Sequence, residues 1–199
     1  MNINENHVSL LARAFENDPL FTYLFTVKNT KNTSQLLIRI LIKRNRVLNG
    51  LILTDHSEKP SYVAFLDKPK IIRNVSLMRV LRLSIEMSVL AFQIPMNVLR
   101  FLSAYQKLTS SSAPNEPHYY LTMIGVDPSV QGKGLGKKVL DDIHRIVDTS
   151  HPPYPIALDT ENPKNIAYYE SFGYKLMDTK IIEGVEIFCM TRPAGDVLQ

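Results

Sequence analysis

Residues 131–137 read Gln-Gly-Lys-Gly-Leu-Gly-Lys, and this glycine-rich stretch decides the fold. The segment before it, Tyr119 to Val126, is apolar and rich in β-branched and aromatic residues, which predicts a strand. The segment after it, Leu135 to Ile146, carries apolar residues at helical spacing. Glycines in the turn can adopt positive φ, and the first N–H groups of the helix are free to bind an anion. We therefore expect this loop to bind phosphate groups of a nucleotide-like ligand.

Spacing excludes two well-known phosphate-binding loops. A Walker loop requires a serine or threonine after its lysine, whereas Lys138 follows Lys137. A dinucleotide-binding loop requires a third glycine at the position of Val139. The pattern that remains is Gln-x-x-Gly-x-Gly at 131–136, which on its own is equally compatible with a glycine-rich turn that binds nothing.

A second pattern lies downstream, after a predicted strand at Tyr154 to Thr160. Asn162 is a favourable N-cap, Pro163 suits the first helical position, and Gly173 suits the end of a short helix. From residue 119 onward the predicted order is therefore strand, glycine-rich loop, helix, strand, short helix and strand.

Together the two patterns resemble the GNAT superfamily of acetyl-CoA-dependent N-acetyltransferases. The loop is similar to that family's Gln/Arg-x-x-Gly-x-Gly/Ala pyrophosphate motif, and Asn162, Tyr169 and Gly173 are similar to its Asn…Tyr-x-x-x-Gly-aromatic motif. These motifs span residues 118–174. Within the family, the chain looks most like the puromycin N-acetyltransferase branch, through the loop and the following segments: Glu116-Pro117, Val126-Asp127-Pro128, Asn165, Tyr169-Glu170 and Cys189-Met190-Thr191-Arg192.

The resemblance implies an α/β (α+β) fold, with a central mixed, mostly antiparallel sheet flanked by helices in a single domain, residues 1–199. Residues 118–174 form the expected acetyl-CoA-binding core, and residues 75–109 form an expected helical insertion on the substrate side. Proteins of the family usually begin with a strand, but a helical pattern starts here at residue 5, so the first family strand is expected to be missing. An open sheet edge is a liability, and a second copy in a homodimer would cover it.

The resemblance also assigns the contacts with acetyl-CoA, which acts as a co-substrate. The pantetheine arm would pair like an added strand with backbone groups of Ile124, Gly125 and Val126. The pyrophosphate would lie on the loop, which comprises Gln131, Gly132, Lys133, Gly134, Leu135, Gly136 and Lys137. Asn162 would hydrogen-bond to the pantetheine arm, with Asn165 and Tyr169 as further cofactor contacts.

Acetyl transfer to an amine requires a neutral amine, a stabilised oxyanion and a protonated leaving thiolate. Tyr169 is the expected general acid, because it stands four residues before Gly173, where the family's acid stands. A purely packing role is the alternative for this tyrosine. The base stays open between Glu116, His118 and a water relay. Glu161 is a further option, although a carboxylate beside a helix start also simply stabilises the helix.

Composition limits the other classes of function. The 199 residues are 45% hydrophobic and 21% charged, as in an ordinary globular protein, and a net charge of +4 without a nucleic-acid-binding motif argues against nucleic acid. The single cysteine, Cys189, lies in an apolar run and is expected to be a buried thiol. No signal-peptide pattern is present, charged residues interrupt the apolar region 75–102, and the histidines show no metal spacing. We expect a cytoplasmic enzyme without metal, membrane or nucleic-acid partners.

The remaining segments give coarser expectations. They predict helices at residues 5–16 and 35–48, a short aromatic segment at 21–25, a loop at 28–34, and a strand pair at 51–54 and 62–66 around a turn at 56–60. A largely helical block at 75–108 divides at Pro95, and a flexible linker follows at 110–117. The helical block and the aromatic segment are expected to supply acceptor specificity.

The expected function is transfer of acetyl from acetyl-CoA to a primary amine, by direct attack in a ternary complex. The puromycin-like segments favour a small-molecule acceptor. Two alternatives stay open: acetylation of a peptide N-terminus or lysine side chain, and an acyl-CoA-binding sensor without turnover.

Overall fold

The computed structural model describes residues 4–26, 31–55 and 57–195. Its centre is a six-stranded sheet in the order β1-β2-β3-β4-β6-β5. The strands are β1 (Leu51–Thr54), β2 (Tyr62–Asp67), β3 (Tyr119–Val126), β4 (Ile156–Thr160), β5 (Lys175–Ile182) and β6 (Val185–Arg192). β3 and β4 pair in parallel and the other neighbours pair antiparallel, which confirms the mixed, mostly antiparallel sheet expected from the sequence.

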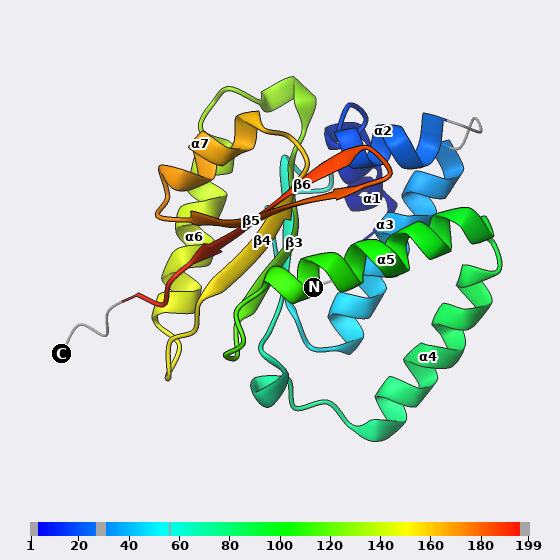
Figure 1. Cartoon of the computed structure of the whole chain (residues 1–199), viewed down its shortest axis with the longest axis horizontal. Helices are drawn as coiled ribbons and strands as arrows, with labels where there is room; N and C mark the ends of the chain where they lie inside the picture. Colours follow the sequence, from blue (N-terminus) through cyan, green and yellow to red (C-terminus); the bar gives the residue numbers. More distant parts are fainter. Residues whose placement is uncertain (1–3, 27–30, 56, 196–199) are drawn as a thin grey trace.

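Helices cover both faces of this sheet (Figure 1). They are α1 (Glu5–Ala14), α2 (Pro19–Thr26), α3 (Lys31–Val47), α4 (Leu77–Ala91), α5 (Met96–Ser112), α6 (Leu135–Asp148) and α7 (Lys164–Glu170), with short 3₁₀ turns η1 (Lys70–Ile72) and η2 (Pro128–Val130). α6 and α7 lie on one face, where Leu140 and Ile143 of α6 are fully buried. α1 and α3 cover the other face through Leu11 and Ile38, and α5 packs beside them through Phe101.

Partway along β3, the side chains that face one layer of helices give way to side chains that face the other layer. In the pairing with β2, Phe65 lies opposite Met123. The next residue of β2, Leu66, lies opposite Leu121, so Thr122 is an extra residue. This β-bulge reverses the alternation of side chains along the strand. As a result Leu121 packs with the α6 layer, whereas Met123 packs with the α1 layer.

The boundaries of several predicted elements differ from those observed. α3 begins at Lys31 rather than at residue 35, because its polar first turn is compatible with a solvated helix start. Residues 28–30 of the predicted loop and residue 56 of the predicted turn lie outside the described residues. The aromatic segment 21–25 is helical and belongs to α2. β4 begins at Ile156, two residues later than predicted, because the prolines just before it cannot donate to a sheet.

α5 continues to Ser112, into the stretch predicted as a flexible linker. Its hydroxyl side chains satisfy carbonyls of the last turns: Thr109 donates to the carbonyl of Tyr105 (3.2 Å), and Ser111 donates to that of Leu108 (2.7 Å). Such bonds let serine and threonine remain in a helix. The linker prediction is therefore wrong for residues 110–112, whereas the predicted division at Pro95 is confirmed, since Pro95 caps α5.

The first three helices come before the sheet in the described part of the chain. Over residues 4–26 and 31–55, α1, α2 and α3 precede β1, which forms one edge of the sheet. Cys189 is buried in β6, as expected. None of the helices in the described ranges has the length and hydrophobicity needed to span a bilayer.

Candidate active site

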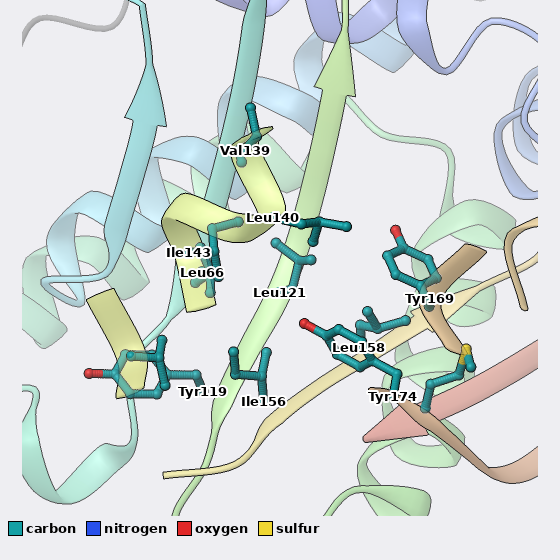
Figure 2. Close-up of a cluster of buried hydrophobic side chains, with 13 residues drawn as sticks. Leu66, Tyr119, Leu121, Val139, Leu140, Ile143, Ile156, Leu158, Tyr169 and Tyr174 are labelled. Carbon is teal, nitrogen blue, oxygen red and sulfur yellow. The ribbon is translucent and has the colours of Figure 1, made fainter. Parts of the chain in front are cut away.

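β3 and β4 separate soon after they meet. Their parallel pairing is confined to Tyr119 with Ile156 and Tyr120 with Ala157. Figure 2 shows the two strands diverging beyond this point, with Leu121 on β3 and Leu158 on β4. The bulge at Thr122 explains the separation, because a bulge bends its strand and increases the local twist. Among the described residues, the later part of β3 thus has no strand partner on its β4 side.

The gap opens into a cavity of about 1430 Å³. Its wall includes β3, the end of β4, and parts of α1, α2, α3 and α5. Ten of the candidate cofactor and catalytic residues named from the sequence border this one cavity, namely Glu116, His118, Ile124, Gly125, Val126, Gln131, Glu161, Asn162, Asn165 and Tyr169. The fold therefore brings the predicted cofactor strand, the predicted acid and the candidate bases together.

The glycine-rich loop lies at the surface next to the cavity, and residues 132–137 are not part of the cavity wall. Gly132 and Gly134 both have φ of 77°, the left-handed region that favours glycine. Gly134 is the N-cap of α6, so the first N–H groups of that helix point to solvent beside the loop. The side chain of Gln131 donates to the carbonyl of Val126 (3.0 Å), which ties the loop to the end of β3.

Positive charge is available at this loop. Lys138 is engaged, since its Nζ lies 3.0 Å from Asp142. Lys133 and Lys137 have no ion-pair partner within residues 4–26, 31–55 and 57–195. Two uncommitted lysines beside a helix N-terminus favour an anionic group.

Tyr169 is buried, with 8% of its surface exposed, and it also borders the cavity. Burial raises the pKa of its phenol well above the ordinary value. A buried tyrosine hydroxyl usually has a hydrogen-bond partner, as Tyr174 has in His144 (3.2 Å). The Tyr169 hydroxyl has none within the part of the chain that the structure describes. Packing explains its ring, which lies with Tyr174 and Leu158 in the core cluster of Figure 2, but packing does not explain its hydroxyl.

The two asparagines organise the connection between β4 and α7. The Oδ1 atom of Asn162 accepts from the backbone N–H of Lys164 (3.1 Å), although the N-cap itself is Pro163, one residue later than predicted. Asn165 donates through Nδ2 to the hydroxyl of Thr160 (2.9 Å). Both side chains therefore hold the cavity wall in shape next to Tyr169.

Glu116 and His118 lie at the rim, where β3 begins. Nδ1 of His118 donates to the backbone carbonyl of Glu116 (2.8 Å), which leaves Nε2 free for another partner. The ring of His118 lies 6.4 Å from that of Tyr120, centroid to centroid. Glu116 is exposed and His118 is partly exposed, so both are more accessible to solvent than Tyr169.

Sequence reasoning named Glu161 but missed the buried polar cluster in the cavity wall to which it belongs. The hydroxyl of Tyr105, on α5, contacts the carboxyl groups of both Asp159 and Glu161, and the hydroxyl of Tyr120 donates to Asp159. Asp159 and Glu161 alternate along the end of β4, so they share a face, and acidic residues at alternate positions of an apolar strand were the available signal. Tyr105 gives no local signal, because only the fold brings α5 to β4.

With this geometry in place, comparison with known proteins shows what the chain is similar to. Residues 100–176, from α5 to the start of β5, match the model of the acetyltransferase (GNAT) domain. The segment contains the glycine-rich loop and Tyr169. The sequence motifs had predicted a resemblance to the same family.

Curated relatives are similar in sequence to this chain over a shorter stretch. A mycothiol acetyltransferase from Thermobifida fusca is 33% identical over 70 residues, which are 35% of this chain and 22% of that protein. A mycothiol acetyltransferase from Nocardiopsis dassonvillei is 32% identical over 68 residues, 34% of this chain and 21% of that protein. The matched part thus spans about a fifth of the length of these relatives.

Solved structures are similar in fold to this chain over nearly its whole length. A structure described as histone acetyltransferase HPA2 and related acetyltransferase, from Corynebacterium glutamicum, superposes with a TM-score of 0.63 at 20% identity and covers 98% of this chain and 93% of that one. The ribosomal-protein-S18-alanine N-acetyltransferase from Escherichia coli gives a TM-score of 0.52 at 15% identity, covering 100% and 97%. At these identities the likeness concerns the fold, which is that of GNAT acetyltransferases.

Proposed function

We propose that this protein transfers an acetyl group from acetyl-CoA to a primary amine, by direct attack in a ternary complex. The observation that carries the proposal is the unpaired length of β3 beside the glycine-rich loop. An extended pantetheine arm matches a strand that lacks a partner, and a diphosphate matches a helix N-terminus with glycines at positive φ. The domain match at residues 100–176 covers both features.

Each part of the site then has a role toward acetyl-CoA. Backbone groups of Ile124, Gly125 and Val126 bind the pantetheine arm, and residues 131–137 bind the pyrophosphate. Asn162 and Asn165 line the arm near Tyr169. Acetyl-CoA supplies an activated acetyl thioester when bound. A backbone N–H of β3 stabilises the developing oxyanion.

Burial refines the role of Tyr169. Its raised pKa keeps the phenol protonated, but it also makes complete proton transfer to a thiolate less favourable than for an exposed tyrosine. We therefore assign the hydroxyl as a hydrogen-bond donor to the sulfur as negative charge develops there. The role of Glu116 and His118, as a base or in a water relay at the rim of the cavity, stays a prediction.

The domain division and the assembly also belong to the proposal. Residues 118–174 form the acetyl-CoA-binding core, and residues 75–109 form an insertion on the acceptor side; the lining of the cavity by Leu102 and Tyr105 of α5 supports this. A homodimer covering a sheet edge and a cytoplasmic location are further predictions. A site for metal is not part of the proposal, and the described residues hold no group of three or more His, Cys, Asp or Glu side chains suited to one.

The acceptor is proposed to be a small molecule. The puromycin-like segments between residues 116 and 192 support this choice, and the curated relatives are named for mycothiol rather than for a protein. A peptide N-terminus or lysine is the first alternative, because one structural neighbour is named as a ribosomal-protein-S18-alanine N-acetyltransferase. A sensor that binds acyl-CoA without turnover is the second alternative.

Thiol release from acetyl-CoA over a panel of acceptors tests these possibilities. The panel combines aliphatic and aromatic primary amines, peptides with a free N-terminus, and N-blocked peptides with one lysine. We expect the highest kcat/KM with a small amine. A higher kcat/KM with peptides than with every small amine would favour the first alternative. Acetyl-CoA binding without turnover of any acceptor would favour the sensor.

A further inference from the structure

The proposed function leaves a polar cluster in the cavity wall without a role. It combines Tyr105 from α5, Tyr120 from β3, Asp159 from β4, and Glu161 just after β4, and all four border the same cavity as Tyr169. We propose that Asp159 takes the proton from the acceptor amine, and that Tyr105 is the positioning residue that holds Asp159 ready for this step. The inference rests on the proposed function and adds to it the group that makes the amine neutral.

Counting hydrogens in the cluster identifies the charged member. A phenol has one hydrogen to donate, so Tyr105 can hydrogen-bond to two carboxyl groups only if one of them is protonated. Asp159 already accepts a second phenol, that of Tyr120. The consistent arrangement has Asp159 ionised and accepting from both tyrosines, while a protonated Glu161 donates to the oxygen of Tyr105.

Electrostatics agrees with this assignment. Burial raises the pKa of Asp159 to about 6, and burial next to Asp159 raises the pKa of Glu161 well above the ordinary value. At neutral pH the pair therefore holds one proton and one negative charge. A carboxylate with a pKa near 6 is suited to general-base work at neutral pH. The titratable groups that face Asp159 from the surrounding elements are Asp18, Tyr105, Tyr120, Glu161, Tyr169 and Cys189.

The reaction balances with these groups. An alkylammonium acceptor gives one proton to the Asp159 carboxylate and becomes a neutral amine. Its nitrogen attacks the acetyl carbon, so that a C–N bond forms and the C–S bond breaks. The thiolate of CoA leaves with the electron pair, stabilised by the hydroxyl of Tyr169, and takes up the second proton that the nitrogen loses. Asp159 returns its proton to water before the next turnover.

A route for that last proton begins at the same cluster. Tyr120 contacts Asp159 with its hydroxyl, and its ring lies beside the ring of His118 at the rim. The predicted relay of Glu116 and His118 thus lies between the cluster and solvent. In this arrangement those two residues pass the proton onward, and Asp159 is the group that contacts the amine.

Asp159→Asn tests the inference with the best alkylamine from the acceptor panel. We expect kcat to fall about 10²-fold or more at pH 7, with the Kd for acetyl-CoA unchanged, because the amide cannot take a proton. The residual rate should rise with pH as more of the amine becomes neutral on its own. Asp178→Asn is the matched control: Asp178 is a strand carboxylate on β5, outside the cavity wall and paired with Lys180 (2.6 Å), and its loss should leave kcat unchanged.

Tyr105→Phe separates positioning from packing. The hydrogen bond from Tyr105 lowers the pKa of Asp159, so its loss raises that pKa. The acid limb of the kcat/KM profile, expected near pH 6 in the unaltered protein, should therefore move to higher pH, and activity should fall more at pH 6 than at pH 8. A tyrosine that only packs would lower activity equally at both pH values and leave the limb in place.

The two hypotheses fail in different ways. Turnover by the unaltered protein together with a fully active Asp159→Asn variant would overturn the assignment of Asp159 and leave the acetyltransferase proposal intact. Absence of turnover by the unaltered protein on every amine would overturn both. Circular dichroism and a thermal melt on each variant confirm that any lost activity does not reflect lost fold.

Discussion

Tyr169→Phe is expected to lower kcat by about 10²-fold or more while the Kd for acetyl-CoA stays nearly unchanged. The ring remains, so the core cluster with Tyr174 and Leu158 keeps its packing. What disappears is the hydroxyl at the cavity wall, which has no partner among the described residues. A donor that acts only on a developing charge affects the rate and not the binding of the ground state. The kinetics of thiol release measure kcat, and a separate binding titration measures the Kd for acetyl-CoA.

Tyr174→Phe is the matched control for this experiment. Tyr174 lies in the same cluster and is as buried as Tyr169, but its hydroxyl bonds to His144 (3.2 Å) and does not border the cavity. Its loss should reduce stability by about 1 kcal/mol without reducing kcat. If Tyr169→Phe retains the full rate, Tyr169 is a packing residue and the assigned donor is wrong.

Gly134→Val should weaken acetyl-CoA binding by about 10²-fold, the equivalent of one to two charge-assisted hydrogen bonds. Gly134 has φ of 77° and caps α6, and apart from its chain neighbours and the backbone of α6, no atom of the described residues lies within 4 Å of a Cβ built there. The valine therefore strains the backbone and occupies the space that the phosphate needs, without a clash with another described residue. Isothermal titration of the variant with acetyl-CoA measures the loss.

Gly184→Val is the control for the effect of backbone strain alone. Gly184 has φ of 84° in the turn between β5 and β6, again with open space around its Cβ position, and it lies outside the cavity wall. Both valines carry a comparable folding cost, of roughly 1–2 kcal/mol for a left-handed residue. Equal loss of affinity in the two variants would mean that Gly134 acts through stability and not through contact with the ligand.

Local patterns predicted the parts of the site that are local. The strand at 119–126 and the glycine-rich turn formed where residue type and spacing placed them, and the predicted short helix formed as Lys164–Glu170, ending three residues before Gly173. Tyr169, the predicted acid, borders the same cavity as the predicted cofactor strand. The chemical roles of these residues remain predictions.

Features that depend on distant pairing were not predictable in this way. The bulge at Thr122 exists only in the register with Phe65 and Leu66 of β2, and it is this bulge that separates β3 from β4. Tyr105 meets Asp159 across 54 positions of sequence. Burial, which raises the pKa of Tyr169, also depends on the assembled core, so the sequence alone suggested a stronger acid than the fold provides.

The central claim is that the main-chain groups of β3 and of the loop at residues 131–137 bind acetyl-CoA. Calorimetric titration of the purified chain with acetyl-CoA tests it most directly, with no need to know the acceptor. The account predicts saturable one-to-one binding, displaced by free CoA and strongly weakened in Gly134→Val. No detectable heat with acetyl-CoA at millimolar concentration, from a folded sample, would contradict it.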